Sequence, residues 1–361
     1  MKVVSHLELF AGIGGFRKAI DLLCYDLKMK SNCIGFSEFD SYATETYKAN
    51  YNTKDEVELG DIYDFTLNKK NIKKLENFDL LTAGFPCQSF SMMGKKLGLN
   101  DKRGNIFYSI IKILKVKNPQ YFILENVRNL KNHDKGNTYK EIYRSLTEDV
   151  DYNISDVVLN TSDFGLPQVR RRIFIIGVCN KNRLSDKVIS SEDIVKNFNT
   201  IKNSSLNYYK NVKDGILNQS VDEKYYLSEK IKPTILADGS KNYKSKSMIN
   251  REIARTLTAS MVKMHRANQD NYYSDDFFKD DYDDDLFQKK SLNDIAKKRI
   301  RKITPLEALK LQGFDESFFI NAKNKNLSNH QLYKQSGNAV SVNTVYALLD
   351  YLIRKKFFLF K

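Results

Sequence analysis

The chain has 361 residues, of which 41% are hydrophobic, and its formal charge at pH 7 is +15. This length can bury a sizeable core and predicts two domains. No apolar stretch reaches the roughly 18 residues of a membrane-spanning helix. Glu8 follows the amino end too early for a secretory signal, so we expect a bacterial cytoplasmic protein without a membrane partner.

The positive charge predicts a polyanionic partner, and nucleic acid is the first candidate because cationic side chains displace its counterions. The alternative explanation is a lysine-rich composition, typical of an AT-rich genome. Neither a zinc site nor a disulfide framework is expected, because the four cysteines lie far apart without CxxC spacing. They are Cys24, Cys33, Cys87 and Cys179.

Residues 1 to about 180 alternate short apolar runs with helical patterns, which predicts a parallel sheet with crossover helices. The predicted strands are Val3–Leu9, Cys33–Ser37, Val57–Leu59, Asp79–Thr82, Tyr121–Leu124, Ile154–Leu159 and Arg172–Val178. The predicted helices between them are Phe16–Tyr25, Ser41–Ala49 and Ile106–Lys115. Tyr121–Leu124 is apolar without alternation, as expected of a strand that is covered on both faces.

From about residue 180 to residue 300 the alternation disappears, and polar segments predict a second, irregular domain rich in loops. Seven aspartates lie between Asp275 and Asp285. We expect this acidic cluster to face away from DNA, whose phosphates would repel it. Helical patterns return at Pro305–Gln312 and Val340–Arg354.

A glycine turn follows the first predicted strand. Gly12 and Gly14 allow close approach of a ligand at a helix N-terminus, but Arg17 occupies the place of the third glycine in the dinucleotide fingerprint. Glu38 ends the second strand, where an acid can accept hydrogen bonds from ribose hydroxyls, and Asp61 follows the third. A tight structural turn and solvated surface acids are the alternatives. A nucleoside without pyrophosphate indicates S-adenosylmethionine.

Cys87 follows Pro86 and the apolar run 78–83, so it is predicted to lie on a loop at the carboxyl end of a buried strand. We interpret it as a nucleophilic thiolate rather than a buried apolar residue. Glu125 ends another apolar strand, where desolvation favours a protonated carboxyl group that can donate to a ring nitrogen. Pairing with a nearby cation is the alternative.

Two arginines stand at alternate positions where the last predicted strand begins. Arg170 and Arg172 would then point to the same face, and their planar guanidinium groups suit base carbonyl or phosphate oxygens. A generic basic turn is the alternative.

Taken together, these motifs resemble those of C5 DNA cytosine methyltransferases of bacterial restriction-modification systems. The resemblance covers most of residues 7–180 and 301–345, in family order and spacing. The matching motifs are Phe10-Ala11-Gly12-x-Gly14-Gly15, Pro86-Cys87-Gln88, Glu125-Asn126-Val127, Gln168-x-Arg170-x-Arg172, Arg301-x-x-Thr304-Pro305-x-Glu307 and Gln335-x-Gly337-Asn338-Ala339-Val340.

The resemblance implies an α/β fold: a Rossmann-like methyltransferase sheet with a smaller, irregular, loop-rich target-recognition domain. Residues 1–182 plus 328–361 would form the catalytic domain, and residues 183–327 the target-recognition domain and hinge. The implied activity is methyl transfer from S-adenosyl-L-methionine to C5 of a flipped cytosine in a specific duplex DNA sequence. It would proceed through a covalent adduct between Cys87 and C6, and S-adenosyl-L-homocysteine would be the product.

By the same resemblance, the catalytic residues are Cys87, Glu125, Arg170 and Arg172. The cofactor-binding residues are Phe10, Gly12, Gly14, Glu38, Phe39, Asp61, Ile62, Pro86 and Asn338. The loop 88–103 would be a lid over the DNA. The expected partners are double-stranded DNA and a cognate restriction endonuclease, and the protein is expected to be a monomer without a metal.

Some positions depart from the family pattern. Phe39 stands in place of the usual Trp, and Ala339 in place of a frequent Ser. The glycine-rich stretch that often follows the segment Thr256-Leu257-Thr258-Ala259 is absent, so the base-reading residues cannot be assigned by analogy.

Three other functions remain open. A transfer RNA cytosine-5 methyltransferase of the same fold is the first, although the variable region of about 120 residues favours DNA. A nicotinamide oxidoreductase would use the glycine turn, but Arg17 disfavours it. An inactive DNA-binding protein is disfavoured by the intact set of Cys87, Glu125 and Arg172.

Overall fold

The computed structural model of the chain describes residues 1–86, 106–180, 189–240, 243–261 and 266–360. Its contacts form two compact units, which we describe one at a time. Unit 1 comprises residues 1–160, 171–206 and 340–361, and unit 2 comprises residues 161–170 and 207–339. These groups of contacts do not test separate folding. The expected domains, residues 1–182 with 328–361 and residues 183–327, therefore stay predictions.

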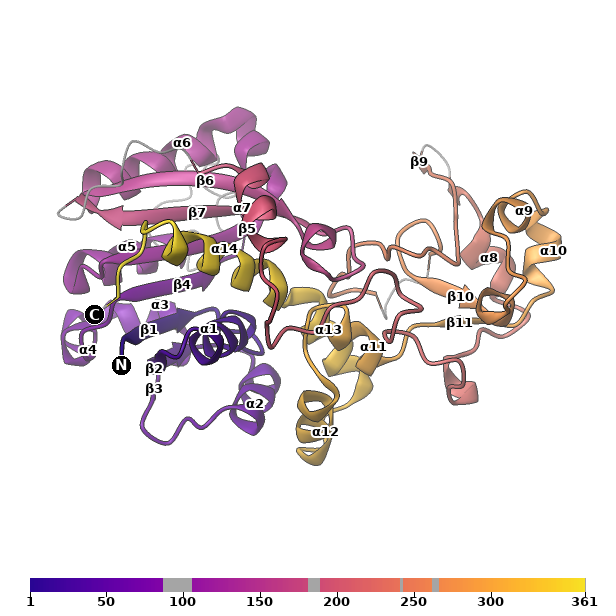
Figure 1. Ribbon diagram of the computed structural model, residues 1–361, viewed down its shortest axis with the longest axis horizontal. Coiled ribbons are helices and arrows are strands. Elements are labelled where there is room, and N and C mark those ends of the chain that lie inside the picture. The colour runs from indigo at the N-terminus through magenta and orange to yellow at the C-terminus, as the bar shows by residue number, and fades with distance from the viewer. Residues whose placement is uncertain (87–105, 181–188, 241–242, 262–265, 361) are drawn as a thin grey trace. The chain divides into compact units, whose positions relative to one another are not determined.

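Unit 1 is built on a seven-stranded sheet (Figure 1). Its strands are β1 (Val3–Leu9), β2 (Lys30–Ser37), β3 (Val57–Glu58), β4 (Leu80–Gly84), β5 (Tyr121–Val127), β6 (Tyr152–Asn160) and β7 (Arg171–Cys179). Their order across the sheet is β3-β2-β1-β4-β5-β7-β6. The chain moves outward in opposite directions from β1 and β4, so a topological switch point lies between these two strands.

The expected common strand direction is correct for six strands and wrong for β7. This strand runs antiparallel to both neighbours, with Tyr121 opposite Val178 and Tyr152 opposite Cys179. The reason is the connection from β6 to β7, which spans only residues 161–170. A parallel pair needs a crossover of a dozen or more residues, whereas an antiparallel pair can be joined by a short segment.

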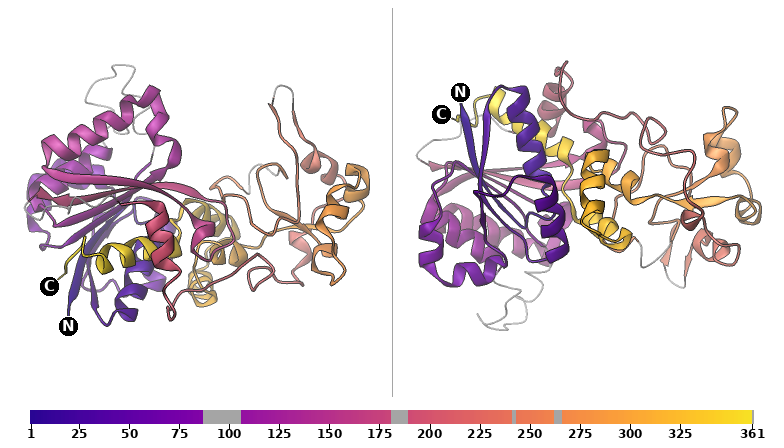
Figure 2. Two further views of the ribbon diagram at one scale, coloured as in Figure 1. Left: turned by 45° about the horizontal axis from the view of Figure 1, so that its top comes forward. Right: turned by 90° about the horizontal axis from the view of Figure 1, so that it is seen from below.

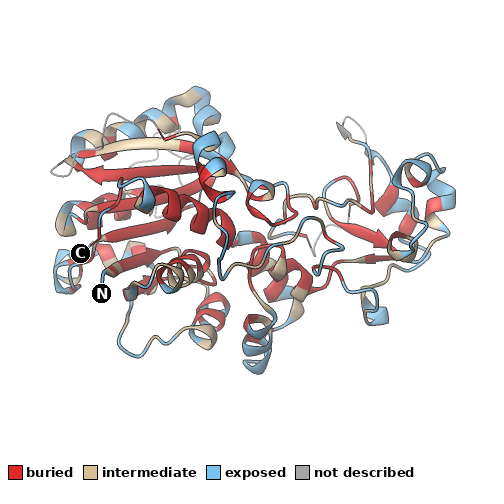
Figure 3. Cartoon of the chain, in the orientation of Figure 1, coloured by how far each residue is buried: buried red, intermediate tan, exposed pale blue. Residues whose placement is uncertain are grey.

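Helices cover both faces of the sheet (Figure 2). They are α1 (Gly15–Asp26), α2 (Ser41–Asn50), α3 (Ile62–Leu67), α4 (Lys69–Lys74), α5 (Ile106–Lys117), α6 (Asn137–Arg144), α7 (Ser191–Phe198) and α14 (Val342–Arg354). Helix α14 packs against α1 and α7, whereas α3 to α6 contribute side chains to one core cluster with the strands. Burial follows the pattern of an amphipathic layer, with buried strands and helices exposed on their outer sides (Figure 3).

Unit 2 consists of short elements joined by long loops, as the sequence predicts for its irregular part. Its strands are β8 (Gly239–Ser240), β9 (Tyr243–Lys244), β10 (Tyr272–Ser274) and β11 (Ile300–Lys302). Its helices are α8 (Lys232–Leu236), α9 (Asp284–Gln288), α10 (Leu292–Ala296), α11 (Pro305–Lys310), α12 (Glu316–Asn324) and α13 (Asn329–Asn338). The strands pair as β8 with β9 and β10 with β11.

A buried ion pair stabilises the start of α11 in unit 2. The guanidinium of Arg301 donates to both carboxylate oxygens of Glu307, at 2.9 and 3.0 Å, and both side chains are 0% exposed. Glu307 also accepts the Thr304 N–H, while Thr304 Oγ1 accepts the Glu307 N–H, which completes a capping box. The motif Arg301-x-x-Thr304-Pro305-x-Glu307 therefore stabilises the N-terminus of α11.

The aspartate cluster of unit 2 is bound to neighbouring groups of its own unit. Asp276 pairs with Lys279 at 2.6 Å and with Lys298 at 2.9 Å. Asp283 caps α9 by accepting the Leu286 N–H. The local partners explain why so many acids gather here, and the expected orientation away from DNA stays a prediction.

Among the helices in the described ranges, none has both the length and the apolar character that a membrane crossing requires.

Candidate active site

The predicted functional residues of unit 1 gather at the carboxyl edge of its sheet. Phe10 follows β1, Glu38 follows β2, Asp61 follows β3, Pro86 follows β4, and Glu125 lies in the last part of β5. These strands are parallel, so their carboxyl ends meet at one edge of the sheet, around the switch point between β1 and β4. Open α/β sheets bind their ligands at this place.

The turn between β1 and α1 has an unusual backbone conformation. Phe10, Gly12 and Gly14 all have positive φ angles, of 53°, 55° and 82°. Glycine adopts this region without cost, whereas Phe10 is a non-glycine residue held in a strained conformation of the kind that clusters at functional sites. The Gly12 N–H donates to Glu38 at 2.8 Å, and the Gly14 N–H donates to the Ala11 carbonyl at 2.8 Å.

These two hydrogen bonds bear on the cofactor. A pyrophosphate site of the dinucleotide type offers free backbone N–H groups to phosphate oxygens. Here the N–H groups of Gly12 and Gly14 are already bound within the protein. The turn therefore fits a ligand without phosphates, such as the nucleoside of S-adenosylmethionine.

Glu38 fixes the turn and still offers acceptor capacity. Its Oε2 accepts the Gly12 N–H and its Oε1 accepts the Asp40 N–H, each at 2.8 Å. Burial raises the pKa of this carboxyl group, and the two N–H donors oppose the shift. Because a carboxylate has about four acceptor positions, two hydrogen bonds leave room for ribose hydroxyls.

Space behind the turn is tight. A Cβ atom at Gly14 would lie 2.4 Å from the ring of Tyr51, whose hydroxyl donates to the Gly14 carbonyl at 2.7 Å. A Cβ atom at Gly15 would lie 2.6 Å from Val340, in the segment before α14. By contrast, a Cβ atom at Gly12 would meet no atom within 4 Å. Of these three glycines, only Gly12 faces open space.

A buried polar network supports the turn from behind. Arg17 pairs with Asp21 at 2.9 Å and with Glu56 at 2.7 Å. Glu8 is 0% exposed, and its Oε2 accepts the Tyr47 hydroxyl at 3.2 Å. Burial raises the pKa of Glu8 to about 8, against the opposing influence of Arg17. Arg17, which stands in place of the third glycine of the dinucleotide fingerprint, therefore stabilises this network through its two ion pairs.

The other predicted cofactor residues differ in exposure. Phe39 is 80% exposed, Pro86 and Asp61 are exposed, and Ile62 is buried. Asp61 caps α3 by accepting the Tyr63 N–H at 2.8 Å. Asn338 is exposed at the end of α13 in unit 2.

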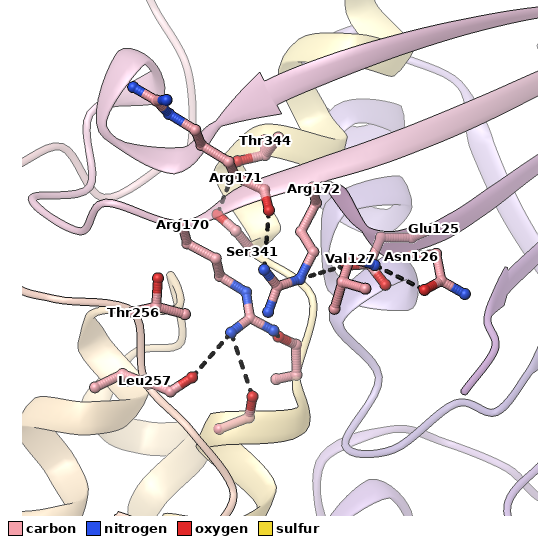
Figure 4. A network of polar contacts seen from close by, with 12 residues as sticks. Glu125, Asn126, Val127, Arg170, Arg171, Arg172, Thr256, Leu257, Ser341 and Thr344 are labelled. Atoms are coloured by element: carbon pink, nitrogen blue, oxygen red, sulfur yellow. Dashed lines mark hydrogen bonds and ion pairs between the residues drawn. The ribbon is translucent and has the colours of Figure 1, made fainter. Parts of the chain in front are cut away.

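Glu125 and Arg172 form an ion pair between neighbouring strands (Figure 4). Arg172 Nε lies 3.0 Å from Glu125 Oε1, and the two side chains are 18% and 12% exposed. The register explains the pair, because Arg172 lies opposite Val127, two residues beyond Glu125 on the same face of β5. The strand continues to Val127, so Glu125 lies within β5 rather than at its end.

The pair bears on the two interpretations of Glu125. The structure shows the cation of the alternative interpretation, because the Arg172 guanidinium lies beside the carboxyl group, whereas donation to a ring nitrogen stays a prediction. Gly84 lies opposite Glu125 in β4, and a Cβ atom at Gly84 would lie 3.6 Å from Glu125 Oε2. An alanine at this position would be in ordinary van der Waals contact with that oxygen.

Asn126 is a residue of the site to which the sequence assigned no role. It is 3% exposed, its Nδ2 donates to the Phe85 carbonyl at 2.9 Å, and its Oδ1 accepts the Val127 N–H at 2.8 Å. It thereby holds the last residues before Cys87 against β5. The sequence feature that could have identified Asn126 is its position between Glu125 and Val127 in a motif that matches the family.

In unit 2, Arg170 binds main-chain carbonyls instead of facing outward. Its Nη1 donates to Leu257 at 3.2 Å and Gly337 at 3.3 Å, and its Nη2 donates to Ala339 at 2.7 Å (Figure 4). Strand β7 begins at Arg171, so Arg170 precedes the strand. Gln168 also binds the loop at Leu257, whose N–H it accepts at 3.0 Å, and it donates to the Leu311 carbonyl after α11 at 2.8 Å.

Cys87 and the predicted lid, residues 88–103, lie outside the described residues. The three other cysteines are free and buried.

Comparison with known proteins identifies the family. The family model for C-5 cytosine-specific DNA methylases matches residues 4–354. The chain belongs to this family. A curated relative, Type II methyltransferase M1.ScrFI of Lactococcus lactis subsp. cremoris, is 36% identical, with 96% of this chain and 77% of the relative covered. Type II methyltransferase M.HpaII of Haemophilus parainfluenzae is 32% identical, with 97% and 89% covered.

Solved structures support the fold of this C-5 cytosine-specific DNA methylase. The S. pombe Dnmt2 methyltransferase has a TM-score of 0.72 at 20% identity and covers 99% of this chain, with 100% of its own chain covered. The Entamoeba histolytica methyltransferase EhMeth has a TM-score of 0.71 at 22% identity, with 99% of both chains covered. The predicted family, enzyme class and Rossmann-like fold are thereby confirmed.

Proposed function

We propose that this methylase transfers a methyl group from S-adenosylmethionine to C5 of a cytosine in a specific duplex DNA sequence, through a covalent adduct with Cys87. The observation that carries the proposal is the Glu125–Arg172 pair, 3.0 Å apart in β5 and β7. Asn126 holds the Phe85 carbonyl, two residues before Cys87, against the same strand. A carboxylate, a guanidinium and a thiol are the groups that activation of a pyrimidine needs.

The reaction begins with extrusion of the cytosine, because C5 and C6 cannot be reached inside the stack. The Cys87 thiolate adds to C6, the π electrons of the C5–C6 double bond form a C4–C5 double bond, and the π electrons of the N3–C4 bond move onto N3. Glu125 binds the exocyclic amine and, once protonated, donates to N3. Arg172 binds O2, where negative charge develops.

C5 then forms its new bond to the methyl group, which S-adenosylmethionine supplies. A base removes the C5 proton, the C5–C6 double bond forms again, Cys87 leaves with the electrons of its bond to C6, and N3 returns its proton to Glu125. The Glu125–Arg172 pair has a second use before the substrate arrives. It satisfies each charge in the free enzyme, so neither group is left unpaired at a half-buried site.

The cofactor would be held at the carboxyl edge of unit 1. Phe10 packs on the adenine, Glu38 binds the ribose hydroxyls and Asp61 binds the adenine amine. Gly12 and Gly14 let the ligand approach the main chain. The other proposed contacts come from Phe39, Ile62, Pro86 and Asn338.

Arg170 is proposed as a positioning residue. Its three carbonyl partners belong to the loop at Leu257 and to the end of α13. An arginine that is 3% exposed and bound in this way fixes main-chain segments of unit 2. Its contribution to catalysis would be indirect, through the geometry of these segments.

Duplex DNA is the proposed substrate, and the protein would act as a monomer in the bacterial cytoplasm beside a cognate restriction endonuclease. The relatives named as Type II methyltransferases and the charge of +15 support this proposal. Transfer RNA is the competing substrate.

The deciding experiment is covalent trapping. Expression in a methylation-free host, followed by sequencing of its methylated DNA, identifies the recognition sequence. A duplex with 5-fluorocytosine at the target position should then trap the enzyme, because fluorine cannot leave as a proton. Cys87→Ala should neither be trapped nor transfer methyl groups, while its cofactor affinity stays nearly unchanged. Methylation of transfer RNA but not of duplex DNA would overturn the proposed substrate.

A further inference from the structure

The sheet edge opposite the site carries a set of lysines that the reaction does not use. Strands β1, β2, β4 and β5 begin at this amino edge, and α4 and the end of α5 lead into β4 and β5. Six exposed lysines form what we call the amino-edge lysine surface. They are Lys69, Lys70, Lys73 and Lys74 of α4 and Lys112 and Lys115 of α5.

The two helices hold this surface together. Lys117, at the end of α5, donates from Nζ to the carbonyls of Lys73, at 3.1 Å, and Leu75, at the end of α4. Ile72 is 1% exposed and belongs to the same core cluster as Ile110 and Ile113 of α5. Since the apolar side of each helix is buried, the lysines face solvent. Lys2, Lys28 and Lys30, also exposed, extend the charge to the first residues of β1 and β2.

The placement of these charges works against the local helix. Helix α4 has six residues and no acid, and Lys69–Lys73 and Lys70–Lys74 are like-charge pairs at i,i+4 spacing. Lys69 and Lys70 also stand in the first turn, where a positive charge opposes the helix dipole. Each effect costs a few tenths of a kcal/mol. Sequences that break local rules without a compensating contact do so most often at functional sites.

The protein offers these lysines little neutralisation. None of the six forms an ion pair with any residue in the described ranges. Glu76 is exposed beside α4, and the Asp79 carboxylate is bound by the Ser5 hydroxyl at 2.7 Å. Elsewhere in unit 1, Lys48 pairs with Glu58 at 2.9 Å and Lys131 pairs with Asp156 at 2.5 Å, while exposed lysines such as Lys54 and Lys140 have no ion pair in the part of the chain that the structure describes. The amino-edge lysine surface is therefore distinguished by its density of like charge, with four lysines in the six residues of α4.

We infer that the amino-edge lysine surface binds the phosphate backbone of a second DNA segment, apart from the segment that holds the target cytosine. This inference rests on the proposed duplex DNA substrate. The strands of five to seven residues place this surface roughly 20 Å from the glycine turn and Glu125, on the opposite edge of the sheet. A second contact of this kind raises the effective concentration of the enzyme on long DNA.

The test compares the full-length enzyme with K69Q/K70Q/K73Q/K74Q. Binding is measured over a salt series with two probes: a plasmid and a short duplex that just contains the recognition sequence. We expect weaker plasmid binding and a log–log salt slope that is shallower by about 2–4, since each phosphate contact contributes about 0.9. Affinity, kcat and KM on the short duplex should stay within about twofold.

K69R/K70R/K73R/K74R is the matched control, because it keeps the charge and should keep plasmid affinity and salt slope. Thermal denaturation of both variants checks that each folds. Unchanged plasmid binding in the glutamine variant would overturn the inference, as would an equal loss on both probes. Stronger binding of the wild type to structured RNA than to the plasmid would also overturn it. These binding measurements do not need turnover, so a failure of the proposed methylation would be seen separately.

Discussion

Two arginine–glutamate pairs, one in each unit, have the same chemistry and opposite surroundings. Arg301 and Glu307 are fully buried, joined by two hydrogen bonds and completed by a capping box. Arg172 and Glu125 keep 18% and 12% of their side chains exposed and share a single close contact at 3.0 Å. In the first pair the Glu307 carboxylate accepts four hydrogen bonds within the protein, whereas the second pair keeps capacity for a ligand.

The difference teaches how to tell a structural pair from a reactive one. A buried pair that loses one partner leaves an uncompensated charge in the core, and stability falls. A partly accessible pair can exchange its partner for a substrate group at small cost. Residue type alone does not separate a structural pair from a reactive pair. The exposed fraction of the side chains and the number of hydrogen bonds that the carboxylate already accepts do separate them.

The substitution Glu125→Gln has the largest expected effect and tests whether the Glu125–Arg172 pair is the reactive one. We expect methyl transfer to slow by roughly 10²–10⁴-fold, the scale of a positioned acid, because the amide can neither carry the charge nor donate a proton to N3. Single-turnover methylation measures the effect, and thermal denaturation should show near wild-type stability. A wild-type rate would move the acid role to another residue.

Glu307→Gln should have the opposite effects, a large loss of stability with little change in kcat. Loss of the carboxylate leaves Arg301 charged and buried, and we expect the free energy of unfolding to fall by about 3–5 kcal/mol. Urea denaturation measures this change. Any protein that remains folded should keep its kcat, and a stable variant with a large loss of kcat would contradict the structural role.

Gly14→Ala tests the strained turn beside the reactive pair. The added methyl group meets the Tyr51 ring at 2.4 Å and a positive φ of 82°, so we expect a cost of about 1–3 kcal/mol and weaker S-adenosylmethionine binding in calorimetry. Gly136→Ala is the control. It has a φ of 88° and an ordinary contact at 3.5 Å, so it should leave cofactor affinity unchanged.

A smaller expected effect is the pH dependence of folding stability that the buried Glu8 causes. The unfolded chain ionises this group near pH 4.5, whereas burial holds the folded pKa at about 8. Between these values only the folded state binds the proton, so stability should fall as pH rises, by at most about 1.4 kcal/mol per pH unit. Glu8→Gln should flatten this dependence in melting curves from pH 5 to pH 8. Equal slopes in both proteins would show that other groups control it.

Local pattern predicted most of unit 1. Apolar runs located the strands, and the glycine turn, Glu38 and Asp61 lie at their carboxyl ends as expected, while their binding of the cofactor stays a prediction. The direction of β7 was missed, because an apolar strand reads the same in both directions and only the short segment 161–170 bears on it. The carbonyl partners of Arg170 were also missed, since residues 257, 337 and 339 are brought to it only by the folded chain.

Unit 2 was predicted only as an irregular region. Its helices and strands are two to ten residues long, and its core side chains come from distant segments such as Val212, Tyr273 and Tyr333. Periodicity needs longer windows to be recognised. The capping box at Thr304 and Glu307 was the exception, because its spacing is local.

The order of segments in unit 1 has a consequence for inheritance. Its sheet is completed before residue 207, and α14 returns to pack against α1 after residue 340. The intervening stretch interrupts no strand of the sheet, so its length and sequence can change over generations while the strand pairing of unit 1 is retained.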